Sequence, residues 1–173
     1  GVPFNPTLGK SSEPEIPSLP LRRNFLLYVG GYDERKNVPL LIKAYLKCIA
    51  NHFPIDLILV GGKDRGFERL ITDEYAQRVT PVILVQPKGD IIFTDPLASN
   101  ELTALYKQAL MLVHPSLYEG FNLPLLEAMH SGIPIVCSDI PANREVTDGQ
   151  ALFFDPRSLD SLGEAIKTLI KNK

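Results

Sequence analysis

The chain has 173 residues, of which 45% are hydrophobic and 22% charged, and its formal net charge is −2. This length and balance are typical of one globular domain and exclude a disordered or collagen-like chain. A weakly acidic chain is not expected to bind nucleic acid through a basic face, and no apolar run approaches the roughly 18 residues that span a bilayer.

The first 24 residues are rich in proline and show no sustained hydrophobic period. Their prolines are Pro3, Pro6, Pro14, Pro17 and Pro20. Proline removes a backbone donor and restricts the preceding residue, so residues 1–24 are predicted to form an extended linker or strap. The folded domain is expected over residues 25–173.

Short apolar runs alternate with helical patterns from residue 25 onward. The apolar runs lie at 25–30, 55–62, 82–86, 90–95, 111–115, 133–138 and 151–156. The helical patterns lie at 38–50, 67–79, from 99 to about 109, at 124–130 and from 159 onward, with Asn37 and Ser99 as expected N-caps. Several strands are continuously apolar, which predicts burial on both faces. The sequence therefore predicts an α/β fold with a doubly wound, parallel, Rossmann-like sheet, and ligands beyond the carboxyl ends of its strands.

The two cysteines and three histidines give little sign of chemistry. Cys48 lies in a helical pattern and Cys137 in an apolar strand, so we expect no disulfide framework and a reducing, cytoplasmic compartment. The histidines His52, His114 and His130 have no paired spacing, so no protein-held metal is expected.

The glycine pairs after the first two strands do not fit G-x-G-x-x-G, which disfavours NAD binding, and no P-loop motif is present. Lys63 and Arg65 follow the second strand and are as compatible with surface charge as with ligand binding.

Two glutamates, Glu119 and Glu127, stand out in the region after the strand at 111–115. Pro124 suits the first turn of a helix, which places Glu119 in the preceding loop and Glu127 about one turn into the helix. Both carboxylates are then expected to face the crevice. The backbone N–H groups around residues 120–123 would point the helix N-terminus into the same space, where an anion can bind.

The stretch PSLYEGFNLPLLEAMHSGIPIVCSD (115–139) resembles the E-x7-E region of retaining glycosyltransferases of the two-domain GT-B type (group 1, family 4). LLYVGGYDERKNVPLLIKAY (26–45) is similar to their first strand and phosphate-binding loop. ASNELTALYKQALMLVHPS and ANREVTDGQALFFDP match their connecting segments in the same order. The resemblance covers residues 25–170 and implies one half of a GT-B fold, the C-terminal, donor-binding half, without the N-terminal acceptor-binding half.

The resemblance also assigns roles to individual residues. Glu119 corresponds to the catalytic carboxylate near the transferred sugar, Glu127 to the one that accepts hydrogen bonds from the ribose, and Lys36 to the lysine on the donor diphosphate. The loops that would cradle phosphate and sugar contain Gly30, Gly31, Gly120, Phe121, Asn122 and Leu123. Cations and N–H dipoles would stabilise the departing diphosphate, and a carboxylate would stabilise an oxocarbenium-like sugar.

Two positions depart from the family pattern. Gly31 stands where many members have an arginine, and we expect Arg35, beside Lys36, to supply the second cation. Asn122 replaces the commoner glycine of E-G-F-G, but asparagine tolerates left-handed backbone angles, so the loop can still form.

The favoured interpretation is a glycosyltransferase in polysaccharide biosynthesis that uses a UDP-, GDP- or ADP-linked sugar and no other cofactor. The isolated chain is expected to bind the nucleotide-sugar donor but to be inactive, and any contact with the inner membrane face would run through the missing half. Two alternatives stay open, a nucleotide- or ligand-binding α/β domain without transfer activity and a sugar-nucleotide epimerase. The epimerase would lack the E-x7-E pair. A receiver-like domain, which is one form of the first alternative, would require an acidic cluster after the first strand.

Overall fold

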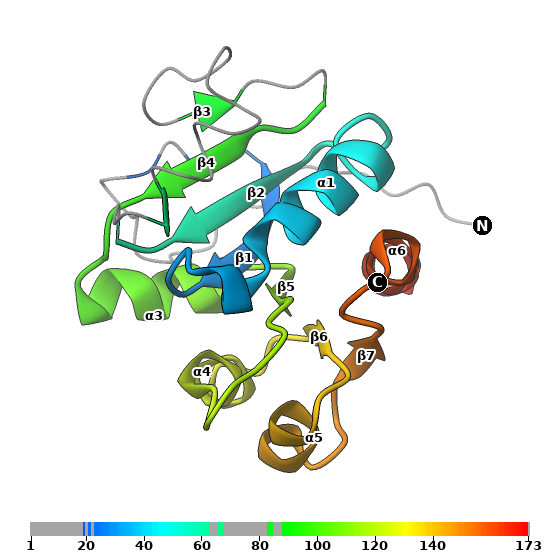
Figure 1. Ribbon diagram of the computed structural model, residues 1–173. Coiled ribbons are helices and arrows are strands. Elements are labelled where there is room, and N and C mark those ends of the chain that lie inside the picture. The colour runs from blue at the N-terminus through cyan, green and yellow to red at the C-terminus, as the bar shows by residue number, and fades with distance from the viewer. Residues whose placement is uncertain are drawn as a thin grey trace.

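The computed structural model describes residues 19, 21, 23–62, 66–67, 83–84 and 88–172. Apart from residue 67, the predicted helix at 67–79 lies outside the described residues. So do the candidate residues Lys63 and Arg65 and nearly all of the proline-rich segment. Among the described residues, seven strands form one sheet in the order β3-β4-β2-β1-β5-β6-β7 (Figure 1). Its strands are β1 (Asn24–Val29), β2 (Ile55–Val60), β3 (Ile83–Leu84), β4 (Ile91–Thr94), β5 (Met111–His114), β6 (Ile135–Ser138) and β7 (Leu152–Phe154).

The predicted fold class is confirmed, with one correction at the edge of the sheet. All neighbouring pairs are parallel except β3 and β4, which pair antiparallel through Ile83 and Ile92. The apolar run at 82–86 had been expected in a parallel sheet. Only residues 85–90 connect β3 to β4, and a parallel crossover needs a dozen residues or more, so the connection is too short for one.

Five α-helices and one short 3-10 helix accompany the described strands, and all but α6 lie between two strands. They are η1 (Glu34–Lys36), α1 (Val38–Cys48), α3 (Ser99–Gln108), α4 (Leu123–His130), α5 (Pro141–Thr147) and α6 (Leu159–Lys171). The expected N-cap Ser99 is wrong, because Ala98 occupies that position and its N–H donates to the Glu101 carboxylate over 3.2 Å. Helix α5 was not predicted, since two turns give too short a hydrophobic period. Pro141 at its first turn was the available signal.

The helices cover both faces of the sheet (Figure 1). Helices α1 and α6 pack on one face together with Leu26 and Tyr28 of β1. Helices α3 and α4 pack on the other face with Phe25 and Leu27 of the same strand. Burial on both faces, predicted from the continuous apolar runs, is therefore confirmed for β1. Among the described helices, none is long and apolar enough to cross a membrane.

The connectivity reverses direction between β1 and β5. The chain runs from β1 outward through β2 to β4, then returns to place β5 on the other side of β1, followed by β6 and β7. β1 and β5 pair in parallel, with Leu26 opposite Met111. From the carboxyl end of β1 the chain continues to one side of the sheet, and from the carboxyl end of β5 it continues to the other. This is a topological switch point, where doubly wound sheets bind ligands.

Candidate functional site

The loops that follow β1 and β5 are hydrogen-bonded to each other at the switch point. The Leu117 N–H donates to the Arg35 carbonyl over 2.7 Å. The Asn37 side-chain amide donates to the carbonyls of Pro115 at 3.1 Å and Pro156 at 2.9 Å. Asn37 is the N-cap of α1, as predicted, but it adopts a left-handed conformation with φ 55° and its side chain does not cap the helix. Its amide instead fixes the spacing of three loops, a role that the sequence did not reveal.

The carboxylate of Glu119 lies at the centre of these loops and is only 5% exposed. Its Oε1 atom accepts from Lys36 Nζ at 2.6 Å, Ser116 Oγ at 2.6 Å and His114 Nε2 at 3.0 Å. Burial alone would raise the pKa of Glu119, but hydrogen bonds from these three groups lower it to about 2. Glu119 is therefore a charged acceptor at neutral pH.

Arg35 contacts two acidic side chains. Its Nε lies 3.0 Å from Asp33 Oδ1, and its Nη1 lies 3.5 Å from the Oε2 atom of Glu119. The Arg35 side chain is half exposed, whereas Lys36 is largely buried. The structure thus brings both predicted cations to Glu119, and only Arg35 presents much of its surface to solvent.

Behind Glu119, His114 and Tyr28 form a buried aromatic pair. Their rings stack with centroids 5.7 Å apart, and His114 is fully buried. Burial lowers the pKa of His114, and burial raises that of Tyr28. The Tyr28 hydroxyl donates to the Gly31 carbonyl over 2.5 Å. The sequence showed only that His114 has no paired spacing with another histidine, and it gave no signal for Tyr28 or Ser116.

Gly30 and Gly61, which follow β1 and β2, are closely packed. Gly30 has φ 155°, and a Cβ atom there would lie 2.8 Å from the Tyr28 hydroxyl. A Cβ on Gly61, which follows β2, would lie 2.2 Å from the Gly30 carbonyl oxygen. Neither position accommodates a larger residue, and the loop therefore presents its backbone at the end of the sheet.

The start of α4 is fixed by Asn122, in the left-handed conformation that was predicted to be tolerated there (φ 53°, ψ 66°). Its side-chain amide donates to Asn143 Oδ1 over 2.7 Å, and Asn143 donates to the Ser138 carbonyl over 2.9 Å. The N–H groups of the first turn of a helix have no intrahelical partners and favour an anion. Gly120 precedes this turn, and a Cβ there would meet nothing within 4 Å.

Glu127 lies on the exposed side of α4, in a different environment from Glu119. The hydroxyl of Tyr106 on α3 donates to Glu127 Oε2 over 2.7 Å. Burial, followed by the bond to Glu127, raises the pKa of Tyr106. Tyr106 lies within the helical pattern predicted from 99 to about 109, and its part in orienting Glu127 comes from the structure.

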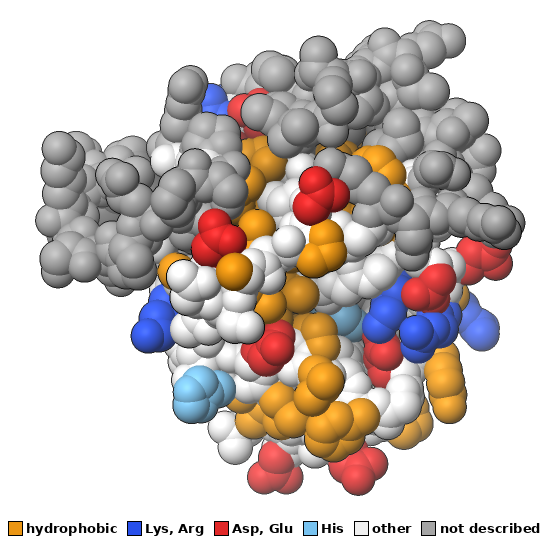
Figure 2. Space-filling view, turned by 90° about the vertical axis from the view of Figure 1, so that its left-hand side faces the viewer, with side chains coloured by type: hydrophobic (Ala, Val, Ile, Leu, Met, Phe, Trp, Pro, Cys, Tyr) orange, Lys and Arg blue, Asp and Glu red, His pale blue; other side chains and the backbone are white. Residues whose placement is uncertain are grey.

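The loop between β5 and α4 exposes several large apolar side chains. They are Leu117, Tyr118 and Phe121, and Leu123 and Met129 follow on α4. In the view onto the carboxyl edge of the sheet, apolar side chains cover a continuous area beside a group of basic ones (Figure 2). The predicted site residues Phe121 and Leu123 thus project outward, each with 60% of its surface exposed.

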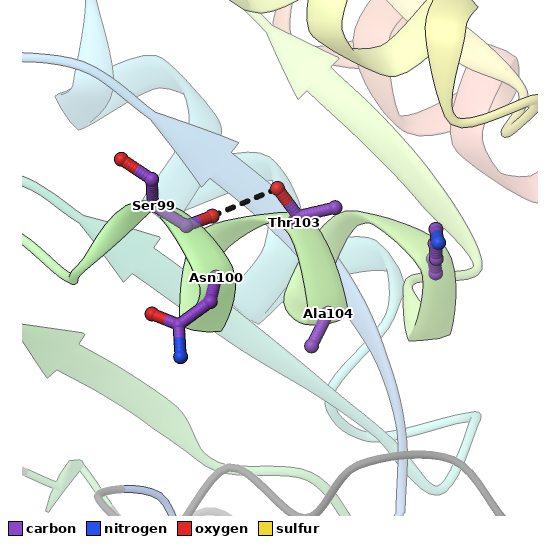
Figure 3. Close-up of a pocket in the computed structure, with 5 residues that line it drawn as sticks. Ser99, Asn100, Thr103 and Ala104 are labelled. Atoms are coloured by element: carbon purple, nitrogen blue, oxygen red, sulfur yellow. Dashed lines mark hydrogen bonds between the residues drawn. The ribbon is translucent and has the colours of Figure 1, made fainter.

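A separate open hollow of about 380 Å³ lies along α3 (Figure 3). Its described lining consists of Ser99, Asn100, Thr103, Ala104 and Lys107. The Thr103 hydroxyl donates to the Ser99 carbonyl over 2.7 Å and is thereby occupied within the helix. None of the predicted site residues lines this hollow.

The residues that the structure describes contain no group of three or more His, Cys, Asp or Glu side chains placed to hold a metal ion. The expectation that the protein holds no metal stays a prediction.

Comparisons with known proteins agree with this architecture. Residues 23–172 match the family model described as glycosyl transferases group 1. The chain is 34% identical over 145 residues to the O-antigen chain mannosyltransferase B of Escherichia coli, which covers 83% of this chain and 36% of that protein. It is 33% identical over 149 residues to the O-antigen chain mannosyltransferase RfbU of Salmonella typhimurium, covering 86% of this chain and 39% of that one. The chain therefore spans little more than a third of the length of these relatives.

Solved structures show the same fold. A sucrose-phosphate synthase from Thermosynechococcus elongatus superposes with a TM-score of 0.71 at 27% identity, covering 90% of this chain and 38% of that one. The Anabaena protein HepE, solved in complex with UDP and glucose, superposes with a TM-score of 0.69 at 19% identity, covering 86% and 39%. The sheet, the order of its segments and the matched family model together show that this chain belongs to the group 1 glycosyltransferases and has the Rossmann-like architecture found in GT-B enzymes.

Proposed function

We propose that this chain is the donor-binding half of a retaining glycosyltransferase, which moves a sugar from a nucleoside-diphosphate sugar to an acceptor. The observation that carries the proposal is the convergence of Lys36 and Arg35 on Glu119 at the switch point of the sheet. The acceptor-binding half would lie outside this chain, since the relatives are more than twice as long. Because two of these relatives are named O-antigen chain mannosyltransferases, we place the reaction in the synthesis of a polysaccharide. A cytoplasmic location, where nucleotide sugars are available, is part of this proposal.

The diphosphate would bind between the two cations and the N-terminus of α4. Lys36 is held by Glu119 through one hydrogen bond, and Arg35 faces the same carboxylate at 3.5 Å. A bound diphosphate brings additional negative charge to these cations, which then share their donors between Glu119 and phosphate. The open space over Gly120 lets a ligand approach the backbone N–H groups closely. No metal is required by this arrangement to offset the charge of the leaving group.

Glu119 is suited to act on the transferred sugar. Its Oε1 atom already accepts three hydrogen bonds, while Oε2 faces only the Arg35 guanidinium among the contacts of the described residues. Oε2 can therefore accept a sugar hydroxyl, and the charged carboxylate can stabilise positive charge that develops on the sugar ring. The low pKa keeps this group ionised throughout the physiological range.

Glu127 is suited to bind the ribose. It is exposed, and the hydrogen bond from Tyr106 to Oε2 fixes its orientation. A carboxylate accepts two hydroxyl groups on adjacent carbons, which is the arrangement on a ribose. We propose that Thr94 and Asp95, at the carboxyl end of β4, lie near the base.

The test is to measure binding of UDP, GDP and ADP, and of their sugar conjugates, to this chain by calorimetry. A ligand that binds the folded state also raises the melting temperature. Glu127→Ala should weaken binding of the preferred nucleotide by roughly tenfold to a hundredfold, because a hydrogen bond to a charged group is lost. Glu164→Ala, which removes an exposed carboxylate on α6, should leave the affinity unchanged.

Two results would contradict the proposal. If none of the nucleotides binds the wild-type chain, the donor-site assignment is wrong. If the chain alone transfers sugar efficiently to a defined acceptor, it is more than the donor-binding half, since a closed, water-excluding cleft would then exist without a second domain.

A further inference from the structure

We propose that His114 is a positioning residue, which holds the Glu119 carboxylate in one orientation through a neutral Nε2–H donor while the neighbouring cations bind the donor diphosphate. The catalytic consequence of this inference rests on the proposed function. The hydrogen bond itself does not, and it can be tested without a ligand.

Four groups surround the Glu119 carboxylate, and they differ in charge. Lys36 and Arg35 are cations, whereas Ser116 and a neutral His114 are uncharged donors. A diphosphate attracts the two cations strongly and weakens their hold on Glu119. The uncharged donors gain far less from a phosphate and stay bound to Oε1. Without them, the carboxylate would lose its remaining hydrogen bonds as the cations turn to the phosphate, and it could rotate away from the negative charge.

The surroundings of His114 select its neutral form. Its Nδ1 atom is buried and has no hydrogen-bond partner among the described residues. A proton on Nδ1 would leave a buried N–H unpaired, which costs more free energy than an unpaired lone pair in the same place. The proton therefore belongs on Nε2, where Glu119 Oε1 accepts it at 3.0 Å. Burial also lowers the pKa of His114, which disfavours the doubly protonated ring.

The imidazole ring is itself held in place. It stacks on Tyr28, whose hydroxyl donates to the Gly31 carbonyl in the loop after β1. One aromatic pair thus supports both the glycine loop and the Glu119 carboxylate. His114 is fully buried, so it acts on a substrate only through Glu119.

The charged and titratable groups that face Glu119 in the described structure are Lys36, Arg35, His114 and Tyr28. Two variants separate the contribution of the His114 donor from that of the other three. His114→Phe keeps a stacking ring and removes the donor. His114→Gln restores a donor, because its amide nitrogen lies as many bonds from Cα as Nε2 does in histidine.

The first experiment follows the Glu119 side-chain carboxyl carbon by NMR during an acid titration of this chain, without nucleotide. In the Phe variant the Glu119 pKa should rise by about one unit, since one of its stabilising hydrogen bonds is lost. In the Gln variant the pKa should return toward the wild-type value. Nitrogen NMR of the wild-type ring should show a protonated Nε2 and a bare Nδ1, a measurement that needs no variant.

The second experiment measures function. In the Phe variant the affinity for the free nucleoside diphosphate should stay within about twofold, while kcat of the complete enzyme falls roughly tenfold with little change in KM, because the loss lies in orientation of Glu119 after binding. The Gln variant should recover most of kcat. If His114 had a purely structural role, kcat would instead fall equally in both variants, and their stability would fall with it.

Three outcomes would overturn the inference. They are an unchanged Glu119 pKa in the Phe variant, a protonated Nδ1 in the wild-type ring, and equal loss of kcat in both variants. A wild-type chain that binds no nucleotide would contradict the proposed function instead, and the ligand-free titration would still report on the His114 hydrogen bond.

Discussion

Lys36 donates to the Glu119 carboxylate over 2.6 Å, although 83 residues separate the two in sequence. The Lys36 side chain is 13% exposed and that of Glu119 5%, so both charges have lost most of their hydration. A buried ion pair adds little net stability, because desolvation offsets much of the Coulomb attraction. Its effect here is to hold a cation and an anion side by side where the loops after β1 and β5 meet.

Arg35→Ala is expected to lower the affinity for a nucleoside diphosphate by about tenfold, as one charge-assisted interaction is lost. Binding of the bare nucleoside should hardly change, because it carries no phosphate. Calorimetry with both ligands measures the difference. Lys47→Ala is the matched control, since it removes an exposed cation that pairs with Asp160 on α6. Equal diphosphate affinities for wild type and Arg35→Ala would mean that Arg35 serves only its contacts with Asp33 and Glu119.

Gly120→Ala should leave the melting temperature within a degree or so of wild type. A Cβ there meets nothing within 4 Å, and the backbone of Gly120 does not adopt the left-handed conformation that alanine resists. The same methyl group would occupy space over the N-terminus of α4, so we expect the affinity for the nucleotide sugar to fall by about tenfold through steric exclusion. Gly61→Ala is the contrasting variant. Its Cβ would lie 2.2 Å from the Gly30 carbonyl oxygen, and it should lower stability directly. Unchanged donor affinity in Gly120→Ala would place the ligand elsewhere.

Stability should fall with acid in two separate ranges. The folded protein lowers the pKa of His114 below its ordinary value of 6.5, so the unfolded chain takes up that proton first and stability declines as the pH falls below about 6.5. The pKa of Glu119 is lowered from 4.5 to about 2, so its contribution is complete above about 4.5 and is lost as the pH falls toward 2.

Urea unfolding at a series of pH values measures both ranges. In His114→Gln the decline in stability over the upper pH range should flatten, and in Glu119→Gln the decline over the lower pH range should flatten. Each variant should keep the decline that belongs to the other residue. A curve for His114→Gln that still falls between neutral pH and the Glu119 range would assign the upper decline to another group.

Asn122→Ala is expected to destabilise the fold more than Asn122→Gly, by about 1 kcal/mol, because only alanine resists the left-handed conformation. Both variants should also lose about 1–3 kcal/mol relative to wild type, since Asn143 Oδ1 is left buried without its donor. Denaturant unfolding measures the three proteins under one condition. The opposite order of the two variants would show that backbone strain at Asn122 does not govern the start of α4.

Sequence patterns alone determined the class of fold. Continuous apolar runs such as FLLYV required strands buried on both faces, and their alternation with amphipathic helices required a doubly wound sheet. Sequence patterns did not predict features whose local signal is weak. Helix α5 has only two turns, and Ser99 lost the N-cap position to Ala98. The antiparallel β3 was not predicted because strand direction depends on the length of a connection rather than on side-chain periodicity.

The two glutamates were evident in the sequence, but their environments were not. Spacing and family resemblance selected Glu119 and Glu127 as a pair of similar groups. Packing separated them, because Glu119 meets Lys36 from the end of another strand and Glu127 meets Tyr106 from another helix. Hydrogen bonds between residues far apart in the chain depend on which strands become neighbours. Only the placement of β5 beside β1 brought His114, Tyr28 and the cations around one carboxylate, since the strand order, not the spacing along the chain, decides which loops meet.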